Sequence, residues 1–371
     1  MSKAEVTFLR DICRPRQWPT LSMVDLVPAG FPVYGANGRI GFAPTFTHEK
    51  PVLLVGCRGS CGTLHITEPR SYANGNAMAL DNFDESKANF RWIYYFLSAR
   101  GFSDVISGSS QPQITQSNIG GIELPPLPSL DEQERIVRVI DEADALRRLR
   151  TQANQRTDAL ISSMFNRMFG DPLSNPKGNK VVRLAELTKR ITDGVHLRPD
   201  YTESGIPFIS VKDITTGKLK FDGCKYISQA DHERFTKRCK PEHLDILYTK
   251  VGATYGRAAL VETTQEFSIY VSVCLIKPDR TVVDSHFLNA AMNTIAVKRQ
   301  ADQRIKGIGV PDLHLDQIRE FLIPIPPLGL QREFAAYVAQ VHELEATQAS
   351  SHTRLDDLFQ SLLHRAFQGE L

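Results

Sequence analysis

Two groups of cysteine and histidine carry the donor atoms of a metal site. They are Cys57, Cys61 and His65, and further along the chain Cys224, Cys239 and His243. The C-x3-C-x3-H spacing of the first group as a whole matches the common zinc spacings poorly, and no clear fourth ligand follows. A lone cysteine in a strand more often serves as a small core hydrophobe. We therefore expect no metal at either group.

The sequence also lacks the signatures of catalysis on DNA. An adenine methyltransferase holds its flipped base with an Asn/Asp-Pro-Pro-Tyr/Phe segment, and the nearest match, Gly170–Asp171–Pro172–Leu173, lacks the second proline and the aromatic residue. The glycines at 35, 38 and 41 fit a hairpin turn better than a dinucleotide-binding loop, and there is no Walker A segment. We expect that the chain is not an enzyme, although one sequence leaves a fused nuclease or methyltransferase open.

Side chains suited to DNA contact lie on glycine-rich segments that follow apolar runs. Base edges are read by Arg, Lys, Asn or Gln, and phosphates are held by Lys, Arg, Ser or backbone N–H groups. Arg58, Lys250, Tyr255 and Arg257 are the leading candidates. The complete set is Arg58, Ser60, Lys250, Tyr255 and Arg257 on these segments, and Asn37, Arg39, Lys212, Lys218 and Lys220 on the adjoining candidate hairpin turns. The alternative for each is a solvated loop residue.

Charge is distributed unevenly although the chain's net charge is only +2. Residues 172–320 hold 23 Lys and Arg against 18 Asp and Glu, whereas residues 321–371 hold 3 against 6. Basic stretches favour nucleic-acid partners, but ordinary fluctuation explains the charge pattern equally well.

A repeat with an offset of 198 residues organises the chain. The segment PLPSLDEQERI from Pro126 matches PIPPLGLQREF from Pro324, and SMFNRMFGDP from Ser163 matches SLLHRAFQGE from Ser361. Both pairs have the same offset, so the stretch between them is ungapped. Such a period indicates a duplicated structural unit.

The repeated stretch predicts a long helix in each copy, preceded by a proline-rich entry. With Ile136 and Phe334 as heptad position a, the a rows are Ile136, Ala143, Arg150, Thr157 and Met164, and Phe334, Val341, Gln348, Leu355 and Leu362. The d rows are Val139, Leu146, Ala153, Leu160 and Arg167, and Tyr337, Leu344, Ser351, Leu358 and Arg365. Both seams are apolar at the ends and polar in the middle, which predicts an antiparallel coiled coil within one chain. Two unrelated amphipathic helices are the alternative.

A mixed globular segment precedes each helix, so the predicted fold class is α+β. Short apolar runs bounded by turn residues predict strands, such as PVLLVG at Pro51 and IPFISV at Ile206. The predicted boundaries are 1–122 for the first mixed domain, 123–170 for the first entry and helix, 171–180 for a linker, 181–320 for the second domain and 321–371 for the second entry and helix. The length of 371 residues suits two such domains.

The order of these segments resembles the specificity subunit of type I restriction–modification systems. The resemblance covers essentially the whole chain and rests on the two proline-rich entries at Ile122 and Ile323, the segment GSSQPQIT at Gly108, its looser partner IGVPDLHLDQI at Ile308, and the terminal Phe367–Gln368–Gly369. It implies two target recognition domains that each read half of a split DNA site, with the helices as spacer. It also implies docking of two methyltransferase subunits and of restriction subunits, which use S-adenosylmethionine, ATP and magnesium; this chain would hold no cofactor.

The cellular setting follows from what the sequence lacks. No apolar run reaches the ~18 residues of a membrane span, and the N-terminal segment has no apolar stretch like that of a secretory signal. The six cysteines are expected to be free thiols. We expect a cytoplasmic protein that binds double-stranded DNA and no membrane. A coiled-coil scaffold with two ligand-binding modules and no role on DNA is the alternative function.

Overall fold

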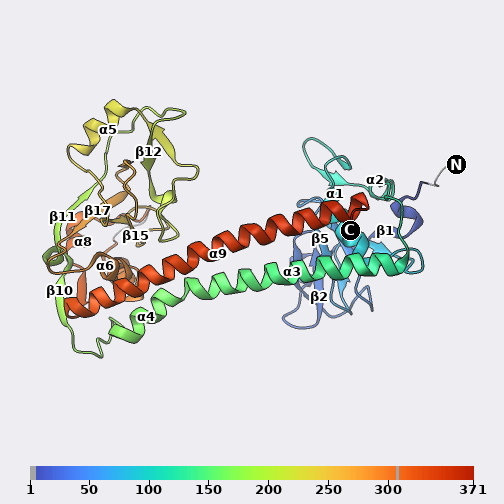
Figure 1. The fold of residues 1–371 in the computed structure, drawn as a ribbon, viewed down its shortest axis with the longest axis horizontal. Coiled ribbons are helices and arrows are strands. Elements are labelled where there is room, and N and C mark those ends of the chain that lie inside the picture. The colour runs from blue at the N-terminus through green and yellow to red at the C-terminus, as the bar shows by residue number, and fades with distance from the viewer. Residues whose placement is uncertain (1–5, 306–308) are drawn as a thin grey trace. The chain divides into compact units, whose positions relative to one another are not determined.

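The computed structural model describes residues 6–305 and 309–371. Contacts divide the chain into two units, Met1–Thr151 with Ser350–Leu371, and Gln152–Ala349. Each unit therefore contains the first part of one long helix and the last part of the other (Figure 1). Ile308, where the looser family segment begins, lies outside the described residues.

The first unit contains a mixed domain followed by the start of a long helix. Its strands are β1 (Arg14–Gln17), β2 (Phe31–Gly35), β3 (Gly38–Ala43), β4 (Leu53–Gly56), β5 (Leu64–Ile66), β6 (Tyr72–Ala73), β7 (Ala77–Asp81), β8 (Ile106–Ser107) and β9 (Gln113–Ile114). Its helices are α1 (Phe90–Arg100), α2 (Gln116–Gly120) and α3 (Leu130–Asp158), with 3-10 turns η1 (Leu9–Asp11) and η2 (Met23–Asp25). Helix α3 runs on past the end of this unit.

The second unit follows the same plan over more residues. Its strands are β10 (Lys180–Arg183), β11 (Thr188–Asp193), β12 (Ile206–Ile209), β13 (Lys225–Ile227), β14 (Ile246–Thr249), β15 (Ala258–Leu260), β16 (Ser268–Ile269), β17 (Val273–Pro278) and β18 (Leu322–Ile325). Its helices are α4 (Leu160–Phe169), α5 (Gln229–Thr236), α6 (Ser285–Met292), α7 (Ile295–Arg304), α8 (Leu315–Arg319) and α9 (Leu328–Gln368), with 3-10 turns η3 (Leu184–Leu187) and η4 (Val211–Asp213).

The two mixed domains share one strand topology. The four-stranded sheets have the orders β1-β7-β4-β5 and β11-β17-β14-β15, and the three-stranded sheets have the orders β3-β2-β6 and β13-β12-β16. In both domains the middle strand of the smaller sheet pairs in parallel with its later neighbour, β2 with β6 and β12 with β16. The duplication predicted from the helices therefore extends to the mixed domains.

The two mixed domains differ in the segments that follow Phe31 and Ile206. The segment after Phe31 forms the expected hairpin of β2 and β3, but the segment after Ile206 does not. There the chain passes through η4 and a long connection before β13 pairs with β12. In the second domain, Asn293 and Thr294 separate α6 from α7.

The long helices begin where the repeat predicts. Helix α3 starts at Leu130 and α9 at Leu328, which differ by the same offset of 198 residues. The first helix is not continuous as expected, because Ala159 separates α3 from α4. Two hydroxyls bond back to preceding carbonyls at this point, Thr157 to Ala153 at 3.1 Å and Ser162 to Ala159 at 3.0 Å. Such bonds compete with the helical ladder and bend helices. In α9 the equivalent residues, Leu355 and Gln360, have no hydroxyl.

The two rows of the predicted seam differ in burial. Ile136, Ala143, Phe334 and Val341 of the a rows are buried. The d rows are displaced by one residue: Leu146, Tyr337, Leu344 and Leu358 are exposed, whereas Ile140, Val338 and Phe359 are buried. Apolar side chains at the predicted d positions suggested burial, but the helices turn these side chains outward.

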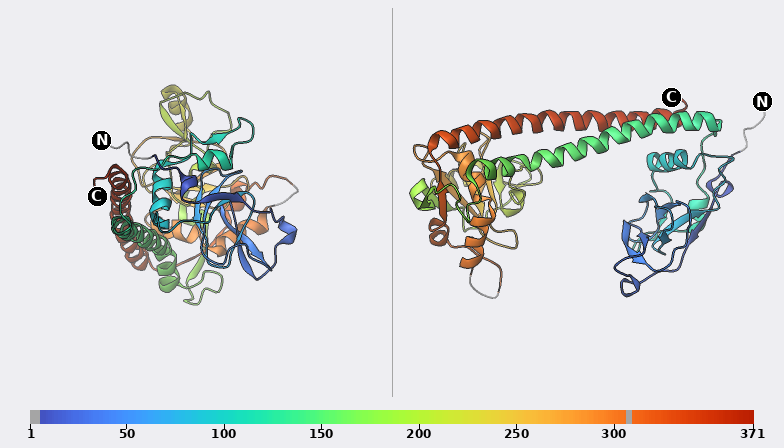
Figure 2. Two further views of the ribbon diagram at one scale, coloured as in Figure 1. Left: turned by 90° about the vertical axis from the view of Figure 1, so that its right-hand side faces the viewer. Right: turned by 90° about the horizontal axis from the view of Figure 1, so that it is seen from below.

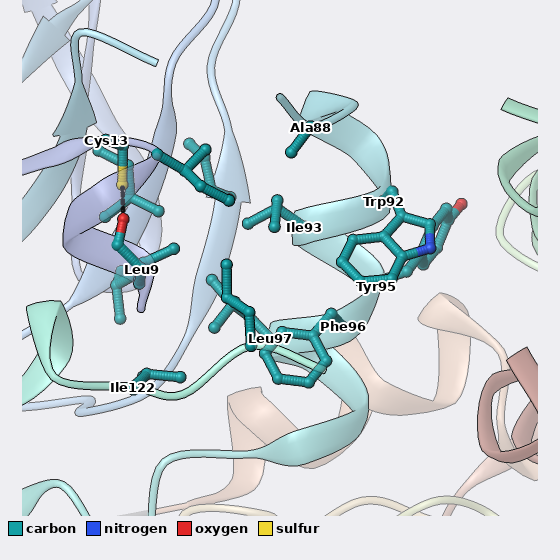
Figure 3. Packing of buried hydrophobic residues seen from close by; sticks show 14 of the residues in the cluster. Leu9, Cys13, Ala88, Trp92, Ile93, Tyr95, Phe96, Leu97 and Ile122 are labelled. Carbon is teal, nitrogen blue, oxygen red and sulfur yellow. Dashed lines mark hydrogen bonds between the residues drawn. The ribbon is translucent and has the colours of Figure 1, made fainter. Parts of the chain in front are cut away.

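Helix α1 joins the first sheet to the long helices. Figure 3 shows Ile93 and Leu97 pointing from α1 toward Leu9 and Cys13, while Trp92 extends from another side of the helix. The ring of Trp92 meets Phe367 of α9 edge-on at 5.2 Å. The last turns of α9 and the first turns of α3 therefore share one core with the mixed domain. The right-hand view of Figure 2 shows these two helix ends next to each other.

Helix contacts within the first unit are polar as well as apolar. The guanidinium of Arg147 in α3 donates to Asp356 of α9 at 2.6 Å and lies 4.3 Å over the ring of Phe359. Arg91 of α1 donates to Asp141 of α3 at 2.5 Å, and the hydroxyl of Tyr95 donates to the same carboxylate. Burial and this hydrogen bond raise the pKa of Tyr95.

The second unit builds the matching core from the other helix ends. Phe165 and Phe169 of α4 surround Phe287 of α6 and Phe334 at the start of α9. Phe169 meets Phe287 edge-on at 5.0 Å, just as Phe367 meets Trp92 in the first unit. In both units, the terminal aromatic residue of one long helix covers the first turn of the domain's helix.

We expect Phe169→Ala to lower the free energy of unfolding by about 3–5 kcal/mol, because a 5 % exposed ring would leave a cavity in the aromatic core. Chemical denaturation measures the change. Leu173→Ala, at a position 45 % exposed, is the control and should stay within about 0.5 kcal/mol. Equal effects of the two substitutions would contradict the packing described.

Candidate nucleic-acid interface

In the first domain the loop between β4 and β5 lies beside the tip of the β2–β3 hairpin. The hydroxyl of Thr63 donates to the carbonyl of Ala36, and the ring of His65 bonds the same oxygen at 3.0 Å. A Cβ on Gly56 would meet Ser60 and Thr63 at under 2.5 Å, so only glycine permits this close loop. The structure thereby brings Asn37 and Arg39 of the hairpin near the loop of Arg58 and Ser60.

Arg58 combines a fixed backbone with an exposed side chain. Its N–H donates to Asn76 at 3.2 Å, and it bridges Gln113 in antiparallel fashion. Ser60 is half-buried, and its carbonyl accepts from Thr63 at 3.0 Å. A rigid loop that holds an arginine toward solvent suits the contact of a base edge or a phosphate.

The hairpin residues are exposed but differ in their partners. Asn37 occupies the turn, where Gly38 has a φ of +95°. Arg39 forms an ion pair with Glu68 at 3.5 Å, and the side chains of both are more than half exposed. Exposed ion pairs of this kind are weak, so Arg39 remains available to an anionic partner.

In the second domain the loop between β14 and β15 corresponds to the loop of Arg58. The side chain of Thr249 ties its two ends, accepting from the Arg257 N–H at 2.9 Å and donating to the Thr254 carbonyl at 2.8 Å. Gly252 and Gly256 adopt φ values of +89° and +88°. Arg257 is exposed.

Lys250 lies in a different environment from that expected for a DNA contact. It is 6 % exposed, and its ammonium group lies 3.3 Å from Asp312. Its backbone bonds to Ser272 and Leu313 repeat those of Cys57 to Asn76 and Ile114. Lys250 therefore occupies the position in the second domain that the buried Cys57 occupies in the first domain.

Three of the remaining candidates of the second domain have side-chain partners within their own unit, whereas Lys220 is exposed. Tyr255 donates to Asp302 of α7 at 2.5 Å and carries the Lys298 ammonium 3.6 Å above its ring. Lys218 pairs with Glu345 of α9 at 2.8 Å. Lys212 was expected on a hairpin turn but lies on η4, where it bonds the carbonyl of Gly223 and lies 3.2 Å from Asp213.

Arg257 lines a cleft of about 650 Å³ within the second unit, together with Lys218, His286 and His342. His342 and Glu262 lie 3.0 Å apart at this cleft. Their hydrogen bond raises the pKa of His342 and lowers the pKa of Glu262. The pair therefore keeps the Glu262 carboxylate charged in the cleft that Arg257 and Lys218 also line.

The cysteine and histidine groups have separate partners. Cys57 is buried and accepts from Gln17 at 3.0 Å, whereas Cys61 contacts the carbonyl of Pro112 at 3.1 Å. Burial raises the pKa of Cys239 to about 11. Within residues 6–305 and 309–371, no three histidine, cysteine or acidic side chains gather as a metal site would require.

Comparison with known proteins gives two family matches along the chain. The model of the type I restriction modification DNA specificity domain matches residues 1–157 and again residues 176–351. The chain belongs to this family. The first match covers one mixed domain and α3 to within one residue of its end, and the second covers the other mixed domain and the first part of α9.

Individual relatives are distant but extend along most of the chain. The chain is 24 % identical over 354 residues to the EcoBI specificity subunit of Escherichia coli, covering 86 % of this chain and 73 % of that subunit. It is 26 % identical over 337 residues to a putative type I specificity subunit of Haemophilus influenzae, covering 86 % and 82 %.

Solved structures show the same fold. The crystal structure of a type I restriction–modification S subunit from M. genitalium aligns with a TM-score of 0.61 at 15 % identity, over 99 % of this chain and 97 % of that chain. A structure from work on complex assembly and conformational transition of the type I R-M system aligns with a TM-score of 0.60 at 17 % identity, over 99 % and 98 %.

Within this specificity-domain fold, the edge strands present basic residues that the sequence did not single out. In the strand register Arg14 of β1 lies opposite Asp81, and Arg190 of β11 lies opposite Lys277. Both strands border clefts, of about 1080 Å³ and 480 Å³. Sequence reasoning considered loops after strands and so passed over exposed arginines inside strands; the RPRQ alternation at Arg14 was the available signal.

Substitution of Lys250 should lower the free energy of unfolding more than substitution of Arg58. We expect Lys250→Ala to lower the free energy of unfolding by about 1–3 kcal/mol, because it removes a buried stem and its ion pair. We expect Arg58→Ala to change the free energy by less than about 0.5 kcal/mol, because its side chain is exposed. Thermal and urea unfolding measure both; the reverse order would contradict the assigned positions.

Proposed function

We propose that this chain is the non-catalytic specificity subunit that directs a type I restriction–modification complex to a split DNA site. The observation that carries the proposal is the double occurrence of one domain topology, each beside a long helix, in a chain of the specificity family. Each domain would read one half-site. Arg58 and Arg257, exposed on corresponding loops, are the foremost candidates for contacts with bases.

We further propose that α3 with α4 and the opposing α9 form an antiparallel coiled coil that spaces the two half-sites. Within each unit the start of one helix shares a core with the end of the other. A helix rises 1.5 Å per residue, so a helix pair of fixed length would hold a fixed gap between the half-sites.

The outward leucines support docking of partner subunits on the helices. Leu146, Leu149, Leu344 and Leu358 are 42–60 % exposed. Apolar side chains on an exposed helix face mark interaction sites. We propose that these leucines contact two methyltransferase subunits and that restriction subunits join the resulting complex. S-adenosylmethionine, ATP and magnesium would be bound by those partners, and the complex would act in the cytoplasm. None of the described helices has the length and apolarity that crossing a bilayer requires.

The test is selection of duplexes from a random pool by the chain purified with its methyltransferase partner. We expect a two-part sequence with a fixed gap, and a binding constant that falls steeply with salt because neutralised phosphates release counterions. A continuous motif would contradict two half-site readers. Salt-insensitive or absent DNA binding would favour the scaffold without a DNA role.

Substitution of single arginines tests which domain reads which half-site. We expect Arg58→Ala to relax one half-site only and Arg257→Ala to relax the other only, each costing about 1–3 kcal/mol of discrimination at the base concerned. Arg135→Ala, which removes an exposed arginine paired with Glu132 on α3, is the control and should leave both halves unchanged. Equal weakening of both half-sites by Arg58→Ala would mean that Arg58 does not read its own half.

A further inference from the structure

Two glutamines are completely buried at the start of the long helices. Gln133 lies in the first turn of α3 and Gln331 in the first turn of α9, and both have 0 % exposure. They differ by the offset of 198 residues that relates the two copies. A buried amide side chain needs partners for both its carbonyl oxygen and its NH2 group.

The two glutamines bond to corresponding partners in the two copies. The Gln133 amide donates to the carbonyl of Pro128 at 2.9 Å and accepts from the backbone N–H of Asn89 at 2.7 Å. The Gln331 amide donates to the carbonyl of Pro326 at 2.8 Å and accepts from the backbone N–H of Asp284 at 2.8 Å. We call this arrangement the buried glutamine bridge.

The bridge links three segments that set the orientation of a domain. Pro128 and Pro326 belong to the proline-rich entries, and the glutamines belong to the long helices. Asn89 and Asp284 are the N-cap residues of α1 and α6, where their side chains accept from N–H groups of the first turn. The bridge thus fixes the first turn of a long helix against the first turn of the domain's own helix.

The bond to the N-cap residue does not depend on that residue's side chain. Asparagine stands at the N-cap in one copy and aspartate in the other, yet the glutamine accepts from the backbone N–H in both. The recognition domains can therefore diverge in sequence while the joint to the helix keeps one geometry.

The aromatic contacts at the same helices are less directional. Phe367 on Trp92 and Phe169 on Phe287 meet edge-on at 5.2 Å and 5.0 Å. Packing of rings tolerates small rotations, whereas hydrogen bonds weaken steeply when misaligned. The directional restraint that both joints share therefore comes from the glutamine, and the first joint adds the hydrogen bonds of Arg91 and Tyr95 to Asp141.

We propose that Gln133 and Gln331 are positioning residues that set the angle of each recognition domain on its long helix, and thereby the gap between the two half-sites. The inference rests on the proposed function, since a gap exists only for a split site. Glutamine is suited to this role because its side-chain amide carries both an NH2 donor group and a carbonyl acceptor without charge.

The test maps methylated adenines in cells that express the full chain with its methyltransferase partner. For Gln133→Met, which keeps the length of the side chain and removes both hydrogen bonds, we expect unchanged half-sites but a relaxed gap. Methylation at sites one base pair shorter or longer should rise at least tenfold relative to the wild type. Gln331→Met should act similarly, and the double variant should exceed either.

Two further variants make the result decisive. Gln133→Asn keeps an uncharged amide but shortens the side chain by one methylene group, so one of the two hydrogen bonds should be lost and a smaller relaxation is expected. It carries the test if the methionine variant does not fold. Gln155→Met, at an exposed position of α3, is the matched control and should retain the wild-type gap.

A structural role alone predicts a different outcome. If the variants lose thermal stability and total methylation while the gap remains as strict as in the wild type, the positioning role is overturned. If the wild type itself shows no two-part motif, the proposed function fails instead, so the two failures are distinguishable.

Discussion

A long amphipathic helix cannot bury its own apolar row, and the rest of this structure depends on how that row is covered. Ile136 and Ile140 at the start of α3 are covered by the mixed domain and by Phe359 and Leu363 near the end of α9. Phe334 and Val338 at the start of α9 are covered in the same way by Phe165 and Phe169. The core of the first unit therefore needs two separate segments of the chain, Met1–Thr151 and Ser350–Leu371, whereas the second unit is the continuous segment Gln152–Ala349 with helix at both of its ends.

This sharing explains why the aromatic residues at the helix ends matter. Phe169 packs into the core of the mixed domain that follows it in the sequence, whereas Phe367 packs into the core of the mixed domain at the other end of the sequence. Each domain is thus held by the start of one helix and by the end of the other. The polar contacts of Arg91 and Arg147 strengthen this joint in the first unit.

The sequence predicted the features that repeat and missed those that depend on contacts distant in the chain. The offset of 198 residues placed both helix starts, and apolar runs placed strands such as β4 and β14. The second seam row was misassigned because Leu146 and Leu344 are apolar but turn outward. The break at Ala159 depends on local hydroxyl bonds that helix periodicity does not contain.

The candidate site was predicted in part for the same reason. The sequence located the β4–β5 and β14–β15 loops, and Arg58 and Arg257 are exposed there. The burial of Lys250 follows from Asp312, 62 residues away, and the engagement of Lys218 follows from Glu345, 127 residues away. No local pattern encodes such pairs. Gln133 and Gln331 stood inside the matched segments, but only their bonds to the N-cap residues distinguish them from other helix residues.

The central claim is that two domains of one chain read two separated parts of one DNA site. Long-read sequencing of genomic DNA from cells expressing the wild-type chain with an active methyltransferase partner tests it most directly. The account predicts methylated adenines in a single motif made of two defined parts and an undefined gap of constant length. Methylation in a continuous motif, or none while the partner is active, would contradict it.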